Sequence, residues 1–280
     1  MFMTTTSFGV EIEFCGITRE RAGRALANYF GSTANYVGGT YKAWEVRDNQ
    51  RRTWSIMRDS SIAAYDDYKC ELVTPVLSGD DDVELMQDAI RVLRKAGAKA
   101  NASCGIHVHV SHKDMTADAL RRLAISWAGK ENCIYETLNV DYNRERNYCR
   151  KTDECFLTKV RKTKNATYES LQEMWYNGDS CWAVRQHYHD SRYHSLNLHS
   201  FFQHKNVEFR CFNSTLHAGK VKAYVQFCLA TVHYAVVKKS VRYQVMPSKR
   251  ANLADWFVRI GLVGEKYKTC RQHMISGLAA

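Results

Sequence analysis

The chain has 280 residues, 45% hydrophobic and 25% charged, a composition that excludes disorder and collagen-like repeats. No apolar run approaches the roughly 20 residues that a membrane-spanning helix needs. Residues 1–7 lack the basic and apolar regions of a signal peptide, so we expect a cytoplasmic protein without a membrane partner. The net charge is +11, and residues 185–250 hold eleven Lys and Arg against two acidic residues. Such a surface favours anionic partners.

The ten cysteines include no Cys-x-x-Cys pair, which argues against zinc ribbons and thioredoxin-type motifs. Several stand inside apolar runs, as Cys211 does beside Phe212. We therefore expect reduced, mostly buried thiols rather than disulfides.

Hydrophobic periodicity predicts elements along the whole chain. In order, they are a strand at 6–14, a helix at 18–30, strands at 53–57 and 68–77, a helix at 80–97, a strand at 101–111, a helix at 115–138, loops with short helices at 139–190, strands at 193–201 and 206–212, a helix at 218–239, and weaker helices at 255–260 and 266–275. Strands close in sequence alternate with long helices, which predicts an α+β fold with a largely antiparallel sheet backed by helices. No Pro- or Gly-rich linker interrupts residues 1–280, so we expect a single domain.

Three predicted strands carry titratable side chains two positions apart. The pairs are Glu11 and Glu13, His107 and His109, and Glu208 and Arg210. Residues i and i+2 of a strand face the same side, about 6–7 Å apart, so each strand has one apolar face and one charged face. A solvated outer face explains any single pair, but solvent faces do not select three such different pairs.

If these strands share a sheet, their carboxylates gather and raise one another's pKa unless they are neutralised. Glu71, in the run Glu-Leu-Val-Thr-Pro-Val-Leu, belongs to the same class, and Asp59 stands at the turn of its hairpin. Carboxylate oxygens with an occasional imidazole suit Mg²⁺ or Mn²⁺ better than zinc. The pattern therefore predicts a divalent-cation site.

The segments Phe-Gly-Val-Glu-Ile-Glu-Phe (8–14), Ser-Cys-Gly-Ile-His-Val-His-Val-Ser (103–111) and Val-Glu-Phe-Arg-Cys-Phe (207–212) resemble signature strands of the glutamine synthetase and glutamate–cysteine ligase superfamily. The closer likeness is to its small stand-alone amidoligases, through Arg-Tyr-His-Ser-Leu-Asn-Leu (192–198), the hairpin at 59–76 and Asn147-Tyr148-Cys149. The likeness covers about residues 7–235 in the same order.

The resemblance implies a funnel of antiparallel strands with ATP entering from one side, an acidic substrate from the other, and Mg²⁺ between them. The implied reaction converts a carboxylate and ATP to an acyl phosphate, which an amine attacks to give an amide and phosphate. Phosphoryl transfer of this kind depends on positioning and charge neutralisation.

The resemblance also implies a set of metal ligands. Glu11 and Glu13 would bind different ions, Glu71 would join Glu13, and His107 and Glu208 would join Glu11. Glutamine synthetase supplies two further carboxylates on the strand corresponding to Glu71, so the number of metal ions stays open.

The remaining implied roles concern substrates. His109 would approach a phosphate of ATP, and Arg210 would stabilise the transferred phosphoryl group, which suits a planar bidentate donor. Asp59 would receive or orient the amine. Arg192 and Asn197 would contact a substrate carboxylate or phosphate.

Two alternatives come from other classes of protein. Residues 139–190 interleave tyrosines with basic residues, a mixture that predicts a lid over the site but can also stack bases and bind phosphates. A nucleic-acid-binding or nucleic-acid-modifying protein using residues 185–250 is the first alternative. The second is a two-metal phosphohydrolase, because clustered carboxylates with histidine also serve hydrolysis. The sequence does not identify the acid, the amine or the oligomeric state, although the net charge favours an anionic, polymeric substrate.

Overall fold

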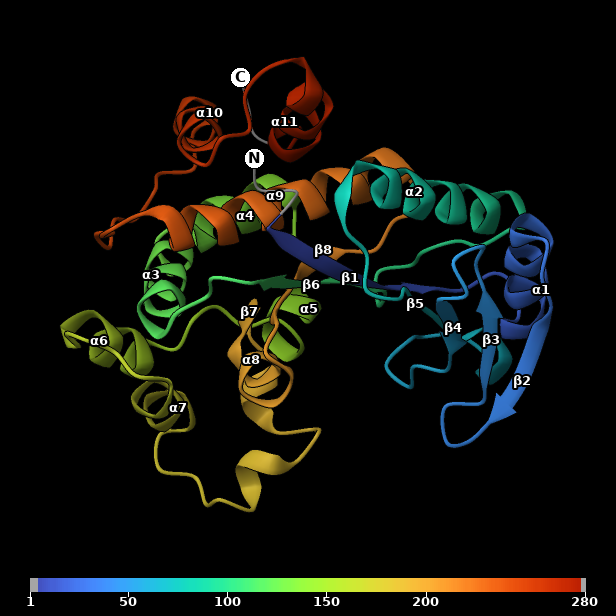
Figure 1. Cartoon of the computed structure of the whole chain (residues 1–280), viewed down its shortest axis with the longest axis horizontal. Helices are drawn as coiled ribbons and strands as arrows, with labels where there is room; N and C mark the ends of the chain where they lie inside the picture. The colour runs from blue at the N-terminus through green and yellow to red at the C-terminus, as the bar shows by residue number, and fades with distance from the viewer. Residues whose placement is uncertain (1–4, 278–280) are drawn as a thin grey trace.

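The computed structural model describes residues 5–277, which contain one eight-stranded sheet (Figure 1). The strand order is β2-β3-β4-β5-β1-β6-β8-β7, and every neighbouring pair is antiparallel. The strands are β1 (Thr6–Phe14), β2 (Ala34–Gly38), β3 (Ala43–Arg47), β4 (Thr53–Met57), β5 (Cys70–Val73), β6 (Gly105–His112), β7 (Leu196–Asn197) and β8 (Val207–Asn213).

Helices lie on both sides of this sheet. They are α1 (Arg19–Phe30), α2 (Gly79–Lys95), α3 (Ala117–Ala128), α4 (Glu131–Leu138), α5 (Tyr142–Asn147), α6 (Glu154–Lys162), α7 (Tyr168–Tyr176), α8 (Leu198–His204), α9 (Ala218–Val237), α10 (Arg250–Arg259) and α11 (Lys268–Ile275). In Figure 1, α2 and α9 cover one face, with α10 and α11 outside α9, while α5 and α8 lie toward the other face. The predicted α+β fold with an antiparallel sheet backed by helices is confirmed.

The main hydrophobic core lies between the sheet and α2 and α9. Val10 and Ile12 of β1 are fully buried, and α9 packs on both β1 and β6. Most of α9 is buried, because it lies between the sheet and the C-terminal helices. Burial of this apolar face leaves the opposite face of β1, β6 and β8 for polar side chains. Among residues 5–277, no helix is long and apolar enough to cross a membrane.

The predicted continuous helix at 115–138 is wrong, because Gly129 separates α3 from α4. A Cβ at Gly129 would collide with the backbone carbonyl of Gln244. The Met246 amide also donates a hydrogen bond to the Gly129 carbonyl, at 2.7 Å. The helix is interrupted where the segment after α9 crosses it, a tertiary contact that local periodicity does not contain.

The predicted strand at 193–201 is also wrong, since only Leu196–Asn197 pairs with β8 and the chain then turns into α8. The Asn197 side chain caps that helix by accepting from the Ser200 amide at 3.3 Å. The predicted strands at 68–77 and 101–111 are longer than observed β5 and β6, and the hairpin of β2 and β3 was not predicted. All ten cysteines are free thiols and seven are buried, as expected.

Candidate active site

The strand register brings the charged faces together. Glu13 lies opposite Glu71 of β5, and Glu11 lies opposite His107 of β6. His109 in turn lies opposite Glu208 of β8. Directly paired residues of antiparallel strands project from the same face, so four strands present their titratable groups to one surface.

Glu11 holds the two histidines of β6. Its two carboxylate oxygens lie 2.8 Å from His107 Nδ1 and 3.0 Å from His109 Nε2. His109 Nδ1 lies 2.9 Å from the Asn206 side-chain oxygen. Burial opposes ionisation of Glu11, but the charges and hydrogen bonds of the imidazoles prevail and lower its pKa. Glu11 therefore stays a carboxylate with its ring partners fixed.

Glu13 is almost completely buried and is oriented from two directions. One carboxylate oxygen accepts from the Gly105 amide at 2.6 Å and lies 3.8 Å from Arg144 Nη1. A Cβ at Gly105 would collide with the Arg144 guanidinium, so a side chain at this position would displace the arginine from Glu13. Arg144 comes from α5, inside the irregular region 139–190 that has no clear periodicity, and it was not predicted as a site residue.

Glu208 is fixed by its neighbours on β8 and β7. It pairs with Arg210 and accepts from Asn197 Nδ2 at 2.6 Å. Burial opposes its ionisation, yet Arg210 and His109 lower its pKa to about 2. Asn197 therefore contacts a site carboxylate through its side-chain amide.

The pKa of Glu71 is shifted in the opposite direction to that of Glu11 and Glu208. Burial, followed by the negative charges of Glu11, Glu13 and Asp59, raises its pKa well above the ordinary value. The negative charges of these carboxylates are thus not fully neutralised by the surrounding cations. A bound cation would remove this conflict, and an oxygen-rich donor set is what Mg²⁺ or Mn²⁺ requires.

Three groups of side chains could each hold a metal ion, with ligand atoms within 4.8 Å of one another. They are Glu13, Asp59 and Glu71; Glu11, His109 and Glu208; and Glu11, Glu71 and His107. The first agrees with the pairing of Glu13 and Glu71 that the resemblance implies. The second contains His109 where the resemblance implies His107.

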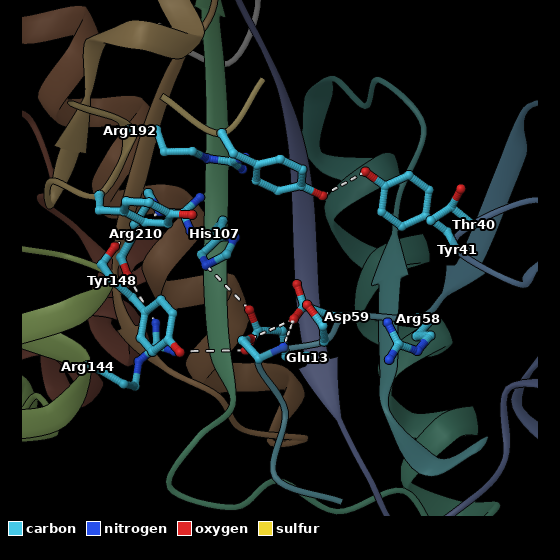
Figure 2. Close-up of a pocket in the computed structure, with 14 residues that line it drawn as sticks. Glu13, Thr40, Tyr41, Arg58, Asp59, His107, Arg144, Tyr148, Arg192 and Arg210 are labelled. Atoms are coloured by element: carbon cyan, nitrogen blue, oxygen red, sulfur yellow. Dashed lines mark hydrogen bonds and ion pairs between the residues drawn. The ribbon is translucent and has the colours of Figure 1, made fainter. Parts of the chain in front are cut away.

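A cavity of about 450 Å³ opens over the Glu13 side of this face (Figure 2). Its lining includes Glu13, His107, Arg210, Asp59 and Arg192 (Figure 2). Asp59 Oδ1 accepts from both the amide and the hydroxyl of Ser61, at 2.6 Å each. Arg192 donates to the His187 carbonyl at 3.0 Å and has no carboxylate partner within residues 5–277. Both groups thus lie within reach of a molecule in the cavity.

Two tyrosines bridge the mouth of that cavity. The hydroxyls of Tyr41, in the turn after β2, and Tyr188, in the segment before β7, are 2.9 Å apart (Figure 2). Both side chains are largely exposed. This contact joins two parts of the chain that are far apart in sequence, so local patterns do not predict it.

Two further cavities lie on the Glu11 side of the same cluster. One, of about 270 Å³, contains Glu11, His109 and Glu208 together with basic side chains that include Arg185 and His187. The other, of about 210 Å³, shares Glu11 and His109 and is otherwise lined mainly by backbone and apolar groups of β1 and the end of β5. The carboxylate cluster is therefore open from two sides.

All ten residues singled out in the sequence converge on this region. Seven lie on the shared strand face, Asp59 and Arg192 line the large cavity, and Asn197 binds Glu208. Arg144, Tyr41 and Asn206 were not predicted as site residues, because they come from loops and short helices. Tyr188 lies in the segment 139–190 that was predicted as a lid.

Comparisons with known proteins bear on this arrangement. A search of curated proteins found no significant match. One similar solved structure is a bifunctional glutathione synthetase from Pasteurella multocida, at 11% identity and a TM-score of 0.47; the alignment covers 99% of this chain and 48% of that one. This chain thus spans about half the length of that enzyme. Residues 4–232 match a family described as "Putative amidoligase enzyme". That match includes most of the chain and all ten candidate residues, and the chain belongs to this amidoligase family.

Proposed function

We propose that this protein is an ATP- and Mg²⁺-dependent carboxylate–amine ligase that forms an amide through an acyl phosphate. The observation that carries the proposal is a buried carboxylate cluster that is open from two sides, with Arg210 beside it in the larger cavity. A ligase that joins a phosphoryl donor to an acid needs two substrates to meet in line at one charge-neutralised point. The three strand segments also support membership of the glutamine synthetase superfamily.

The two sides suggest different occupants. The two cavities on the Glu11 side combine an apolar part with the guanidinium groups of Arg185 and Arg192, which suits a nucleotide base and its phosphates. The 450 Å³ cavity on the Glu13 side combines Arg192 with Asp59, which suits an acid and an amine. We therefore assign ATP to the first side and the acceptors to the second.

The donor chemistry fits a divalent cation in each of two groups. Glu13 and Glu71 would hold one ion, and Glu11, Glu208 and one of the β6 histidines the other. Such ions would neutralise charge on phosphate oxygens.

The chain's own side chains then have defined tasks. Glu208 orients the Arg210 guanidinium, whose planar fork would bind the phosphoryl group as it moves to the substrate carboxylate. ADP leaves in that step, and phosphate leaves when the amine attacks the acyl carbon. Asp59 would accept the proton that the amine loses, and Arg192 would hold a carboxylate of the acceptor. His109 would contact a phosphate of ATP.

We infer that residues 139–190 act as a lid-like insertion in a single catalytic domain of residues 1–280. Arg144 and Tyr148 of this segment line the acceptor cavity. Tyr188, near the end of this segment, contacts the hydroxyl of Tyr41, and this contact would open when substrates enter.

The test is release of phosphate from ATP with Mg²⁺, using a panel of amino acids, peptides and polyamines with hydroxylamine as the trapping amine. Turnover that needs both a carboxylate and hydroxylamine and yields a hydroxamate would support the proposal and identify the acid. Glu11→Gln should abolish it, whereas Glu84→Gln, an exposed change on α2, should not. Phosphate release without either acceptor would favour the phosphohydrolase. Absence of both turnover and Mg²⁺-dependent ATP binding would refute the ligase.

A further inference from the structure

A separate cavity of about 340 Å³ lies on the opposite side of the sheet from the carboxylate cluster. It is formed where Ser126 and Lys130, at the α3–α4 junction, meet the segment after α9 and helix α10. In Figure 1, α10 lies on the outer side of α9, away from β1 and β6. Most of its wall follows residue 232, where the family match ends, so the family's activity does not account for it.

Lys130 is the central cation of this cavity. Its ammonium lies 4.7 Å from the centre of the Trp256 ring, and the side chain is half-buried. Within residues 5–277 no carboxylate lies at ion-pairing distance from it. Burial, and then the charge of Arg259, lower the pKa of Lys130, because a half-buried ammonium beside a guanidinium lacks a counter-charge.

Two further cations line this cavity. Arg242 and Arg259 add two guanidinium groups, and the one carboxylate, Asp255, is already paired with Arg259 at 2.7 Å. The hydroxyl of Ser240 is also among the lining groups. Three cations against one engaged carboxylate leave the cavity with a surplus of positive charge.

The walls of the cavity are fixed by the contacts that divide α3 from α4. The Met246 amide binds the Gly129 carbonyl, and the Gln244 backbone packs where Gly129 has no side chain. On the other side, Trp256 packs edge-on against Tyr234 of α9, with ring centres 4.9 Å apart. The cations are therefore held by docked elements rather than by a free chain end.

We propose that this cavity binds a small organic phosphate, with Lys130, Arg242 and Arg259 contacting its phosphate group. A phosphate monoester carries close to two negative charges and three acceptor oxygens at neutral pH, and guanidinium groups match its geometry. A volume of about 340 Å³ is larger than one phosphate ion requires and falls in the range of small-molecule sites. The site is independent of the proposed ligase activity.

The experiment measures protection of Lys130 from acetylation by a limiting amount of an acetyl ester, with peptide mass spectrometry of the full chain. Inorganic phosphate, adenosine monophosphate and citrate are the probes, and Lys162, exposed on α6, is the internal reference. At a concentration about ten times the dissociation constant, mass action should lower Lys130 modification about ten-fold without changing Lys162. Because the readout is at Lys130, binding of the same probes at the carboxylate cluster does not affect it.

Arg242→Gln should weaken protection, whereas Lys249→Gln, an exposed change in the same loop outside the cavity, should leave it intact. Protection by adenosine monophosphate at a lower concentration than inorganic phosphate would support an organic phosphate as the ligand. Equal potency of the two probes would show that only the phosphate ion is recognised and would overturn the assignment of an organic ligand. Citrate protecting as well as the phosphates would refute the phosphate assignment. No protection by any probe, or equal loss in both variants, would refute the site.

Discussion

Glu131 offers a sharp test of the electrostatics of the buried hydrogen-bond network that joins α4 to Thr152 and Ser195. It begins α4, is only 3% exposed, and receives the Thr152 amide at 3.0 Å on each of its oxygens. It also bonds the hydroxyl of Ser195, which in turn accepts from Trp127 Nε1 at 2.7 Å. Burial outweighs these hydrogen bonds and raises the pKa of Glu131 to about 7 from 4.5.

The sign of the effect follows from proton binding. Below pH 4.5 Glu131 is protonated in both the folded and unfolded chain. Between 4.5 and about 7 the unfolded chain loses a proton that the folded chain keeps, so Glu131 lowers the free energy of unfolding as pH rises through this window and no further above it. The full difference of about 2.5 pKa units corresponds to about 3 kcal/mol.

Glu131→Gln removes this titration while keeping an acceptor oxygen for Thr152 and Ser195. The stability of the variant relative to wild type should therefore be about 2–3 kcal/mol greater at pH 8 than at pH 5, measured by urea unfolding at a series of pH values. Glu136→Gln, an exposed change on the same helix, should show no such trend. A difference between Glu131→Gln and wild type that does not vary with pH would show that Glu131 is ionised throughout and refute the reasoning.

Three further outcomes are expected. Mg²⁺ at about 100 times its dissociation constant should stabilise the wild type by roughly 3 kcal/mol and Glu71→Gln much less, as thermal unfolding with and without EDTA will measure. Arg144→Met should lower the free energy of unfolding by about 3 kcal/mol because it leaves the buried Glu13 carboxylate without its cation; urea unfolding that matches wild type would contradict this. Tyr188→Phe removes one exposed hydrogen bond to Tyr41, worth about 1 kcal/mol, which is proposed to open when substrates enter. The variant should therefore lower the KM of the acid by about five-fold and leave kcat unchanged.

The charged strand faces could be predicted because a strand alternates with a period of two whatever its partners are. That local rule and the assumption of a shared sheet were enough to place four residues on one surface: Glu11, Glu13, His107 and Glu208. The observed register then put Glu13 opposite Glu71, a pairing that no local pattern specifies. Strand alternation predicts the face on which a residue lies, but not its neighbours across the sheet.

The groups that complete the site could not be predicted from strand alternation. Arg144 reaches Glu13 from a short helix, through the space left by the missing side chain of Gly105. The hydroxyls of Tyr41 and Tyr188 meet across the cavity mouth from separate loops. Neither arrangement has a period in the sequence, because both depend on how loops and a short helix pack on the sheet.

The break between α3 and α4 shows how one docking contact can both defeat a local prediction and create a binding surface. The periodic pattern runs through Gly129, yet the helix ends there because Gln244 and Met246 cross it. The same crossing brings Arg242 beside Lys130 and forms the cationic cavity. The segment after α9, which lies outside the family match, thus interrupts a helical stretch inside that match. The docked segment brings Arg242 close to Lys130, and the repulsion between these cations opposes its docking. An anion bound between them would remove the repulsion, so ligand binding should stabilise the docked C-terminal segment as well as protect Lys130.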